Sequence, residues 1–491
     1  MSQQEGQREE LARAMNMGDV LALAFGTMIG WGWIMLAGQW VGTGGTVGAI
    51  LAFALGAVMC MFVGLAYAEL TPALPLSGGE LVFSFRAMGY NASWFTGWMI
   101  TLAYVGVAAW EGPAIANALD YLFKPYLPAG PTLWTIEGSS VGTTFLIIGI
   151  VGALILTIIN VNGVKTAATF QTVATIAMAI GGVAFFVCGV IKGDTDYLVP
   201  AFTNKTGLVT VILMVPAMFV GFDVIPQAAE EMNIPLPKIG QVIVISILLA
   251  AAWYMLMVFA CAISAPHEVR YDPNDPGKIG VAEAFTYAMN SPVFGKIIIV
   301  AAMCGILTSW NGFFIGASRV LFSMGRARML PKIFAQVNPK HKSPQFAIIL
   351  VGIICMISPV LGKGALVWFV DAAAMGTVVA YFMVSLSYLI LKKKEPELKR
   401  PYEIKGGGGI FVGIMAVAVA LFFLYLYLPL GSPAPLTGIE WGIVGIWLVL
   451  GVIFFLINQA SLKKEYNTPE KKEEWKKFVE YMMFGDEYKR F

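Results

Sequence analysis

Long apolar stretches separated by short polar segments recur along the whole chain. Each approaches or exceeds the roughly 20 mostly apolar residues that a helix needs to cross a bilayer. An even number of spans would place both chain ends on the same side of the membrane. The pattern predicts an all-α polytopic membrane protein with 12 transmembrane helices, over residues 18–40, 46–71, 88–122, 141–159, 166–192, 207–231, 239–265, 292–323, 345–361, 366–391, 410–428 and 438–458.

Two of these stretches are interrupted by glycine and proline. The first interruption carries Gly26, Gly30 and Gly32 within the first predicted span, and the second lies between Pro216 and Pro226 in the sixth. A helix in lipid cannot leave its backbone N–H and C=O groups unpaired, so broken backbone at membrane depth must line a protein cavity. Broken spans in corresponding halves are typical of transporters that bind their substrate near the bilayer midplane.

The two breaks are five predicted spans apart, and an odd offset inverts the second copy relative to the first. We therefore expect a five-plus-five inverted repeat with broken helices 1 and 6, followed by helices 11 and 12. The expected division of the chain is 1–17 cytoplasmic N-terminal segment, 18–391 transport core, 392–409 cytoplasmic basic loop, 410–458 helices 11 and 12, and 459–491 cytoplasmic amphipathic tail.

Composition and charge agree with a membrane location. The chain is 58% hydrophobic and 13% charged, whereas about a quarter of the residues of a soluble domain are charged. With the N-terminus inside, 24 lysines and arginines fall in the inner segments and 6 in the outer ones. This bias predicts cytoplasmic N- and C-termini in the plasma (inner) membrane. The net charge of +2 reflects this sorting by loop and does not favour a nucleic-acid partner.

Few residues suggest metal or catalytic chemistry. The five cysteines all fall in apolar stretches, where small buried residues are the simpler interpretation. The two histidines have no ligand cluster around them, and no nucleophile motif or phosphate loop is present. We expect no enzyme activity and no cofactor other than a coupling ion, either a proton or sodium.

The C-terminal tail has a helical pattern of its own. Trp475, Phe478, Val479 and Met482 recur on one face after a capping residue and a first-turn proline. We expect a short amphipathic helix that lies against the cytoplasmic membrane surface or against the protein's own loops.

The chemistry of the two breaks suggests what they bind. Unwinding of the first would expose backbone amides at the start of the following half-helix, and such amides bind carboxylates. The unpaired carbonyls of the second, together with Asp223, could receive an ammonium group.

Several motifs then resemble one known family. They are residues 26–32, Tyr67-Ala68-Glu69-Leu70 with Ser77-Gly78-Gly79 and Arg86, Gly221-Phe222-Asp223 through Pro235, and Ser309-Trp310-Asn311 through Pro339. Together these motifs resemble the amino acid–polyamine–organocation (APC) transporter family over most of residues 18–390. The resemblance implies a LeuT-like fold and transport of amino acids or amines. It also implies that the amides of residues 29–32 hold the substrate carboxylate and that the carbonyls of Phe219, Val220 and Phe222 hold the amine.

The sequence departs from the family pattern at three positions. Ala217 stands where many members carry an aromatic gate, Met178 stands where several carry a lysine on helix 5, and Trp31 is larger than the usual residue. The resulting candidate substrate-binding residues are Thr27, Ile29, Gly30, Trp31, Gly32, Glu111, Ala217, Phe219, Val220, Gly221, Phe222 and Asp223.

Two of the acids within predicted spans are candidates for a functional role, Glu111 on helix 3 and Asp223 on helix 6. An ionised carboxylate at membrane depth costs at least ~2.5 kcal/mol, so each should face a cavity and have a partner. We expect them to pair with a cationic substrate group or to carry the coupling proton. The alternative is a structural hydrogen bond to a neighbouring broken helix.

Sodium is the competing coupling ion. The hydroxyls of Thr308 and Ser309 and the carbonyls of Gly26 and Ile29 could together surround it. The simpler alternative is that both hydroxyls bond back to carbonyls of their own helix.

Charged residues at helix ends suggest a gate. Glu230 and Glu231 could form salt bridges with Arg86 or Arg326 and close the cytoplasmic side. The alternative is that all four are solvated charges.

The sequence therefore predicts a secondary active transporter of an amino acid or related amine. The pattern favours a cationic substrate with proton coupling or exchange, and a sodium-coupled or uncoupled neutral amino acid transporter is the alternative. An ion channel would need pore-lining rows of polar residues, which the apolar stretches do not show. The expected partners are a small molecule and the lipid bilayer, and nothing in the pattern indicates an oligomeric state.

Overall fold

The computed structural model describes residues 10–123, 126, 130–136, 139–272, 278–433 and 435–485. Helices make up most of this part of the chain. The elements in order are α1 (Met17–Met28), α2 (Gly32–Gly44), α3 (Thr46–Ala73), α4 (Glu80–Met88), α5 (Tyr90–Phe123), β1 (Thr132–Ile136), β2 (Ser139–Gly142), α6 (Thr143–Val161), α7 (Val164–Lys192), η1 (Thr195–Leu198), α8 (Lys205–Met218), α9 (Val224–Gln227), η2 (Ala229–Glu231), α10 (Leu236–Ser264), α11 (His267–Arg270), α12 (Gly280–Met289), α13 (Pro292–Arg326), η3 (Lys332–Ala335), α14 (Gln345–Ile357), η4 (Ser358–Leu361), α15 (Gly362–Lys394), α16 (Gly407–Tyr427), α17 (Gly438–Glu465) and α18 (Pro469–Phe484).

The apolar helices account for the membrane location. Among the described residues, nine helices are long and apolar enough to cross a bilayer alone, namely α3, α5, α6, α7, α10, α13, α15, α16 and α17. The pair α1 and α2 passes the same test together and is bent by 49°, and α8 and Gln345–Leu361 are shorter apolar helices. The protein is a multi-pass helical membrane protein whose helices follow the predicted apolar stretches to within several residues.

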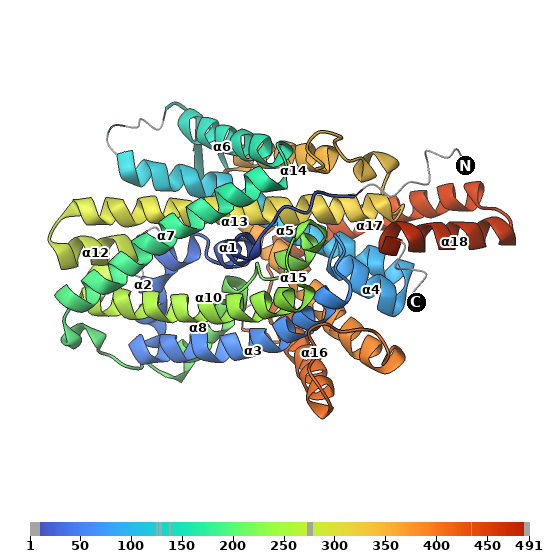
Figure 1. Cartoon of the computed structure of the whole chain (residues 1–491). Coiled ribbons are helices and arrows are strands. Elements are labelled where there is room, and N and C mark those ends of the chain that lie inside the picture. Colours follow the sequence, from blue (N-terminus) through green and yellow to red (C-terminus); the bar gives the residue numbers. More distant parts are fainter. Residues whose placement is uncertain are drawn as a thin grey trace.

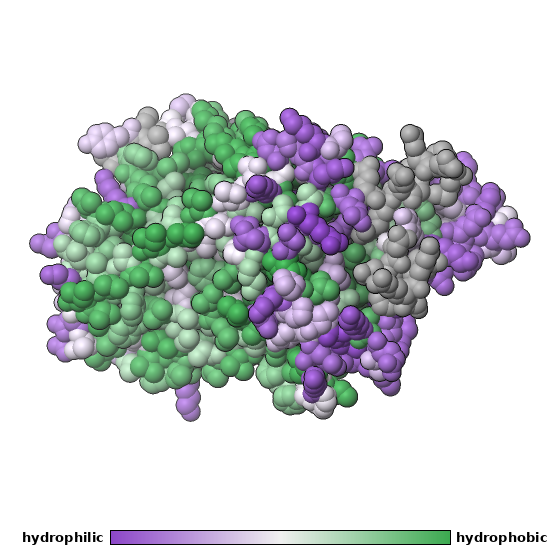
Figure 2. Space-filling view, in the orientation of Figure 1, coloured by the Kyte–Doolittle hydropathy of each residue, from purple (hydrophilic) through white to green (hydrophobic). Residues whose placement is uncertain are grey.

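The long helices lie along the length of the molecule, as α13, α10 and α7 show (Figure 1). Hydrophobic residues cover most of the visible face, and hydrophilic residues gather toward the end that carries α4 and α18, with fewer at the opposite end (Figure 2). We call these the α18 end and the opposite end. The described start of the chain lies toward the α18 end as well.

A small hairpin departs from the all-helical prediction. Strands β1 and β2 pair antiparallel between α5 and α6. Trp134 ties the hairpin to η4 by donating a hydrogen bond from Nε1 to the Val360 carbonyl at 3.0 Å. Threonine, tryptophan and isoleucine favour strands, but β1 is largely exposed on both faces, so no alternation of polar and apolar residues marked it.

The first break separates α1 from α2. The side chain of Asn16 accepts hydrogen bonds from the amides of Gly18 and Asp19 and so starts α1. The helix stops at Met28, although the Ile29 amide still bonds to the Phe25 carbonyl. Residues 29–31 leave the helical path, and α2 resumes at Gly32. The break therefore falls on the predicted glycine-rich stretch.

The second break separates α8 from α9. Helix α8 ends at Met218, two residues after Pro216, and Gly221 has a φ of 137°. This backbone conformation is one that residues with a side chain rarely adopt. Helix α9 begins at Val224 and is a single short turn that contains Pro226. Glycine and proline thus interrupt the sixth apolar stretch as the pattern indicated.

The C-terminal helix α18 docks on the protein itself. Thr468 caps it by accepting a hydrogen bond from the Lys471 amide. The Trp475 ring packs against Tyr90 with centroids 5.2 Å apart, and Phe484 packs against Phe85 at 5.8 Å. The Arg328 guanidinium lies over the Phe478 ring. The apolar face of α18 therefore covers the segment around α4 and the exit of α13.

Candidate functional site

The two helix breaks lie against each other in the structure. A Cβ atom on Gly221, in the second break, would lie 2.7 Å from the amide nitrogen of Met28 at the end of α1. The Tyr254 hydroxyl of α10 donates a hydrogen bond to the Met28 carbonyl at 2.8 Å. Glycine is therefore required at position 221 both for its backbone conformation and for this close approach.

Backbone groups of both breaks remain free to bind a ligand. No hydrogen bond within the described chain uses the amides of Gly30, Trp31 and Gly32, or the carbonyls of Phe219 and Val220. Unpaired groups of this kind are costly at membrane depth unless a ligand or water satisfies them. The first break offers donors suited to a carboxylate, and the second offers acceptors suited to an ammonium group.

A cavity of about 450 Å³ opens beside the breaks. Most of its wall is apolar, and its aromatic lining residues are Trp31, Trp110, Tyr254 and Phe313. The structure brings eight of the sequence-predicted residues to this wall, which are Thr27, Gly30, Trp31, Gly32, Glu111, Ala217, Val220 and Ser309.

The other predicted residues lie outside the lining of this cavity. Phe222 stacks on Tyr381 with ring centroids 5.4 Å apart, and Phe219 is fully buried near Tyr254. The predicted residues outside the lining are Gly26, Ile29, Phe219, Gly221, Phe222, Asp223 and Thr308. They support the breaks from behind through packing and hydrogen bonds.

Glu111 is the acid that faces the cavity. Helix α5 buries it to 3% exposure, and the Ser309 hydroxyl of α13 donates a hydrogen bond to its Oε1 atom. The other carboxyl oxygen, Oε2, has no hydrogen-bond partner. Asn117, almost two turns further along α5, also lines the cavity, and its amide oxygen has no hydrogen-bond partner. Two residues of the cavity lining therefore each carry a buried acceptor without a donor.

Asp223 has a different environment. Its Oδ1 atom accepts a hydrogen bond from the Gly221 amide at 2.7 Å, and its Oδ2 atom accepts one from the Tyr104 hydroxyl at 2.8 Å. Tyr381 donates a longer bond to Oδ1 at 3.4 Å. The carboxyl group thus holds the second break in shape, and Asp223 is not among the residues that line the cavity.

Comparison with known proteins identifies the family. A family model described as amino acid permease matches residues 16–455. The chain belongs to the amino acid permease family. This membership confirms the resemblance to the amino acid–polyamine–organocation transporters, and the match covers both helix breaks.

Individual relatives of this permease family carry different substrate names. The chain is 26% identical over 460 residues to the methylthioribose transporter of Bacillus subtilis (strain 168), covering 92% of this chain and 95% of that protein. It is 25% identical over 474 residues to the branched-chain amino acid permease BcaP of the same organism, covering 93% and 95%. It is 25% identical over 393 residues to cationic amino acid transporter 4 of Mus musculus, covering 78% and 60%.

The predicted sodium ligands of this permease family member are only partly assembled. The Thr308 hydroxyl donates to the Gly305 carbonyl of its own helix at 2.9 Å, and the Ser309 hydroxyl points to Glu111. The Ile29 carbonyl does face α13, because a Cβ atom on Gly305 would lie 2.9 Å from it. Met178, at the family's lysine position, places its sulfur 3.1 Å from the same point.

A chain of side-chain amides connects α6, α13, α7 and α1, and it was not expected from the sequence. Asn160 donates to Asn311 at 2.9 Å, and Asn311 donates to Gln171 at 2.8 Å. Gln171 in turn donates to the Thr308 carbonyl at 3.0 Å and to the Ala22 carbonyl at 3.3 Å. Amide side chains in otherwise apolar helices were the only available signal. Through Gln171 this chain donates hydrogen bonds to the Ala22 carbonyl of α1 and the Thr308 carbonyl of α13.

Two buried ion pairs lie toward the α18 end of this permease. Arg326 binds Glu230 through two contacts at 2.7 and 3.0 Å, which is one of the pairings predicted from the sequence, and its action as a gate stays a prediction. Glu231 is held by two contacts of 2.8 Å to Arg319, both side chains being fully buried. Arg319 lies within the eighth predicted span, residues 292–323, and no partner for it was predicted from the sequence. The Arg319 guanidinium donates to both carboxyl oxygens of Glu231, and these two bonds replace the water that the buried charges lose.

The sequence suggested Arg86 as a partner of Glu230 or Glu231, but the structure pairs it with a different acid. It forms a half-buried salt bridge of 3.0 Å with Glu395, after α15. Helix α4 packs against α15, and this packing brings Arg86 to Glu395 just after the end of α15.

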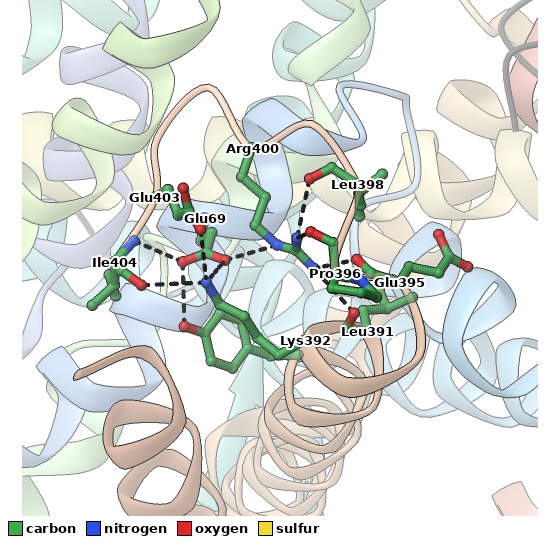
Figure 3. A network of polar contacts seen from close by, with 10 residues as sticks. Glu69, Leu391, Lys392, Glu395, Pro396, Leu398, Arg400, Glu403 and Ile404 are labelled. Atoms are coloured by element: carbon green, nitrogen blue, oxygen red, sulfur yellow. Dashed lines mark hydrogen bonds and ion pairs between the residues drawn. The ribbon is translucent and has the colours of Figure 1, made fainter. Parts of the chain in front are cut away.

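Glu69 anchors the loop between α15 and α16 (Figure 3). Lys392 and Arg400 form salt bridges with its Oε1 atom at 2.7 and 2.9 Å, and the Ile404 amide donates to its Oε2 atom at 2.9 Å. Arg400 also donates to three carbonyls of the same loop and to the Leu391 carbonyl of α15. Lys392 and Arg400 belong to the segment predicted as a cytoplasmic basic loop, residues 392–409. Their ion pairs with Glu69 connect this segment to α3.

Proposed function

We propose that the protein is a secondary active transporter of an amino acid or related amine that works by alternating access. The observation that carries this proposal is the convergence, at one mostly apolar cavity, of unpaired amides from the first break, a carbonyl of the second break and the unpartnered Glu111 carboxyl oxygen. A zwitterionic ligand would satisfy all three. Membership of the amino acid permease family supports the same function.

The roles we assign follow the charges of the site. The amides of Gly30, Trp31 and Gly32 bind the carboxylate at the start of α2. The carbonyls of Phe219 and Val220 bind the α-ammonium group. The apolar wall holds the aliphatic part of the side chain.

Glu111 sets the preference for a cationic substrate. Glu111 and Asn117 both line the cavity beyond the first break, and Glu111 Oε2 and the Asn117 oxygen are buried without a hydrogen-bond partner. Leaving a carboxyl oxygen buried and unpaired is unfavourable, and a guanidinium or ammonium group on the substrate would remove that cost. A neutral amino acid is the alternative substrate, which the apolar lining would accept.

The architecture proposed for transport is the five-plus-five inverted repeat of 12 spans. The two breaks at α1–α2 and α8–α9 support it, together with helices along each predicted span. We assign the α18 end to the cytoplasm of a plasma membrane, because the basic loops after α13 and α15 and the tail lie on that side.

The conformation described is one that faces outward. The cavity wall continues along α2 and along the halves of α5 and α15 that run toward the opposite end. The α18 end is held shut by the pairs Arg319–Glu231 and Arg326–Glu230. The start of the chain adds to this closure, because the amides of Ala14 and Met15 donate to the Glu231 carbonyl.

Flux into proteoliposomes tests the proposal. Purified full-length protein is reconstituted and loaded with unlabelled L-arginine or L-leucine, and entry of the labelled compound is followed. We expect saturable counterflow, with L-arginine preferred. A conductance at single-channel rates that is indifferent to both amino acids would show a channel instead.

A further inference from the structure

A second buried carboxyl group lies directly behind the second break. Glu80, the first residue of α4, is fully buried. The Tyr67 hydroxyl donates to its Oε1 atom at 3.1 Å, and the Gln227 amide contacts its Oε2 atom. The Tyr104 hydroxyl lies 3.4 Å from Oε1 and 2.8 Å from Oδ2 of Asp223. One phenol oxygen therefore bridges two buried acids.

Hydrogen counting indicates a proton between these acids. The Tyr104 oxygen carries one hydrogen, yet it lies within hydrogen-bonding distance of three acceptors, which are Glu80 Oε1, Asp223 Oδ2 and the Asp223 carbonyl. When the Tyr104 hydroxyl donates its hydrogen to Asp223, the Tyr104 oxygen can only accept from Glu80. The contact between Tyr104 and Glu80 is then favourable only if the Glu80 carboxyl group is protonated. A protonated Glu80 donates to Tyr104, and Tyr104 then donates to Asp223.

The side chain of Gln227 gives independent support for two protonation states of Glu80. Its side chain is fully buried, and its Oε1 atom has no hydrogen-bond partner. Rotation of the amide by half a turn would present this oxygen to Glu80 in place of the nitrogen. The same side chain can therefore donate to an ionised Glu80 or accept from a protonated one.

No cation neutralises the two acids within the described chain. The groups facing them are the phenols of Tyr67 on α3, Tyr104 on α5 and Tyr381 on α15. The thiol of Cys60 adjoins Tyr381. From α13, the arginines at 319 and 326 are engaged by Glu231 and Glu230 instead. Burial and the neighbouring Asp223 raise the pKa of Glu80 well above its usual range.

We propose that Glu80, Tyr104 and Asp223 form the site that binds the coupling proton. This proposal rests on the proposed transport function and adds Glu80 as a residue of the coupling machinery. In the transfer step the O–H bond of Glu80 breaks as its proton passes to the Tyr104 oxygen, while the original Tyr104 proton passes to Asp223 Oδ2. One proton moves between the two carboxyl groups, and no other reactant is consumed.

The site is connected to both the substrate break and the closed end. Asp223 accepts from the Gly221 amide within the break. On the other side, Ser77 donates its hydroxyl to the Gln227 carbonyl at 3.1 Å and its amide to Glu230 at 3.3 Å. Protonation therefore changes the charge seen by the second break and, through Ser77, by the pair of Glu230 with Arg326.

Proton flux separates this site from a structural cluster. Full-length protein in proteoliposomes containing a pH-sensitive dye is tested with L-arginine and L-leucine. We expect substrate-dependent proton entry in the wild type and a loss of at least tenfold in Glu80→Gln, with counterflow of the amino acid retained. Tyr104→Phe should slow proton entry while leaving both acids in place. The control Glu283→Gln, whose acid bonds to Tyr121 at 3.2 Å away from this site, should behave as wild type.

The outcomes distinguish this site from the proposed function. Proton entry at the wild-type rate in Glu80→Gln, or counterflow without proton entry in the wild type, would overturn the proton site and leave the transporter intact. Absence of counterflow in every protein would count against the transport function.

Infrared spectra then decide the proton site without transport. One component of the protonated-carboxyl band at neutral pH, which shifts in heavy water, should disappear in Glu80→Gln and persist in Glu283→Gln. A band unchanged in Glu80→Gln would overturn the proposal. Size-exclusion profiles and melting temperatures show that each variant is folded.

Discussion

Gly221 packs against the backbone amide of Met28, so that the second helix break rests on the first. A Cβ atom at position 221 would come within 2.7 Å of that nitrogen and 2.9 Å of the Thr27 carbonyl carbon. The contact joins two segments almost two hundred residues apart. Movement of one break must therefore displace the other, which is what alternating access around a shared site requires.

Replacing Gly221 by alanine should damage both stability and transport. The substitution adds a clash with α1 and forces a residue with a side chain into a φ of 137°, which costs about 1–3 kcal/mol. Thermal unfolding in detergent should show the loss, and counterflow should fall with it. Gly445→Ala is the matched control, because a Cβ atom there meets nothing within 4 Å. Equal melting temperatures for the two variants would contradict the close approach.

Truncating one member of the buried pair Arg319–Glu231 should be strongly destabilising. Arg319→Ala leaves the Glu231 carboxylate buried and unpaired, at a cost of about 3–5 kcal/mol. Replacing both residues by apolar ones of similar size should cost less than either single change, because no charge is then left over. Melting temperatures of the singles and the double variant measure this. Arg86→Ala, which breaks a pair whose side chains are 21% exposed, is the control and should have a smaller effect.

Neutralising Glu111 should change selectivity more than capacity. In Glu111→Gln the cavity keeps its shape but loses the charge-assisted bond to a cationic substrate, which is worth about 1.5–3 kcal/mol. Competition assays should show the affinity for L-arginine falling by about 10- to 100-fold, while L-leucine is affected little. An unchanged ratio between the two amino acids would remove Glu111 from substrate recognition.

Transport should continue when sodium is replaced by choline. The Gln171 amide already donates to the carbonyls that α1 and α13 turn toward each other, and the Thr308 hydroxyl bonds to its own helix. Gln171→Ala would remove its bonds to these carbonyls and to Asn311, although Thr175 still donates to Ala22 and Asn311 still donates to Ala167. The loss should destabilise the protein by about 0.5–1.5 kcal/mol. A strict sodium requirement in the wild type would favour the alternative coupling ion and contradict this expectation.

The stability difference between wild type and Glu80→Gln should depend on pH. An acid whose pKa is raised in the folded state contributes its full stability below the unfolded pKa, and this contribution is lost as pH rises toward the folded value. Glu80→Gln has no carboxyl group at this position, so its stability does not fall for this reason as the pH rises. Its melting temperature relative to wild type should therefore increase between about pH 5 and pH 8. A constant difference across this range would show that burial does not perturb Glu80.

The spans and the two helix breaks could be predicted from the sequence, whereas most side-chain partners could not. The glycines of the first break and the prolines flanking the second act through local backbone constraints, which composition alone reveals. Partners such as Arg319 for Glu231 are 88 residues apart, and Glu80 meets Asp223 through Tyr104 on a third helix. Such contacts depend on how the helices pack, which no local pattern encodes. For the same reason Asp223, expected at the substrate, is turned toward Tyr104.

By itself, the sequence determined that this is a multi-pass membrane protein of helices with two interrupted spans, because lipid demands long apolar stretches and forbids unpaired backbone. Only the tertiary structure decided which acid faces the cavity, which faces a second acid, and which arginines close the α18 end. The physical reason is that burial and hydrogen bonding act across helices. A carboxyl group such as Glu111 or Glu80 therefore takes its role from the neighbours that packing gives it.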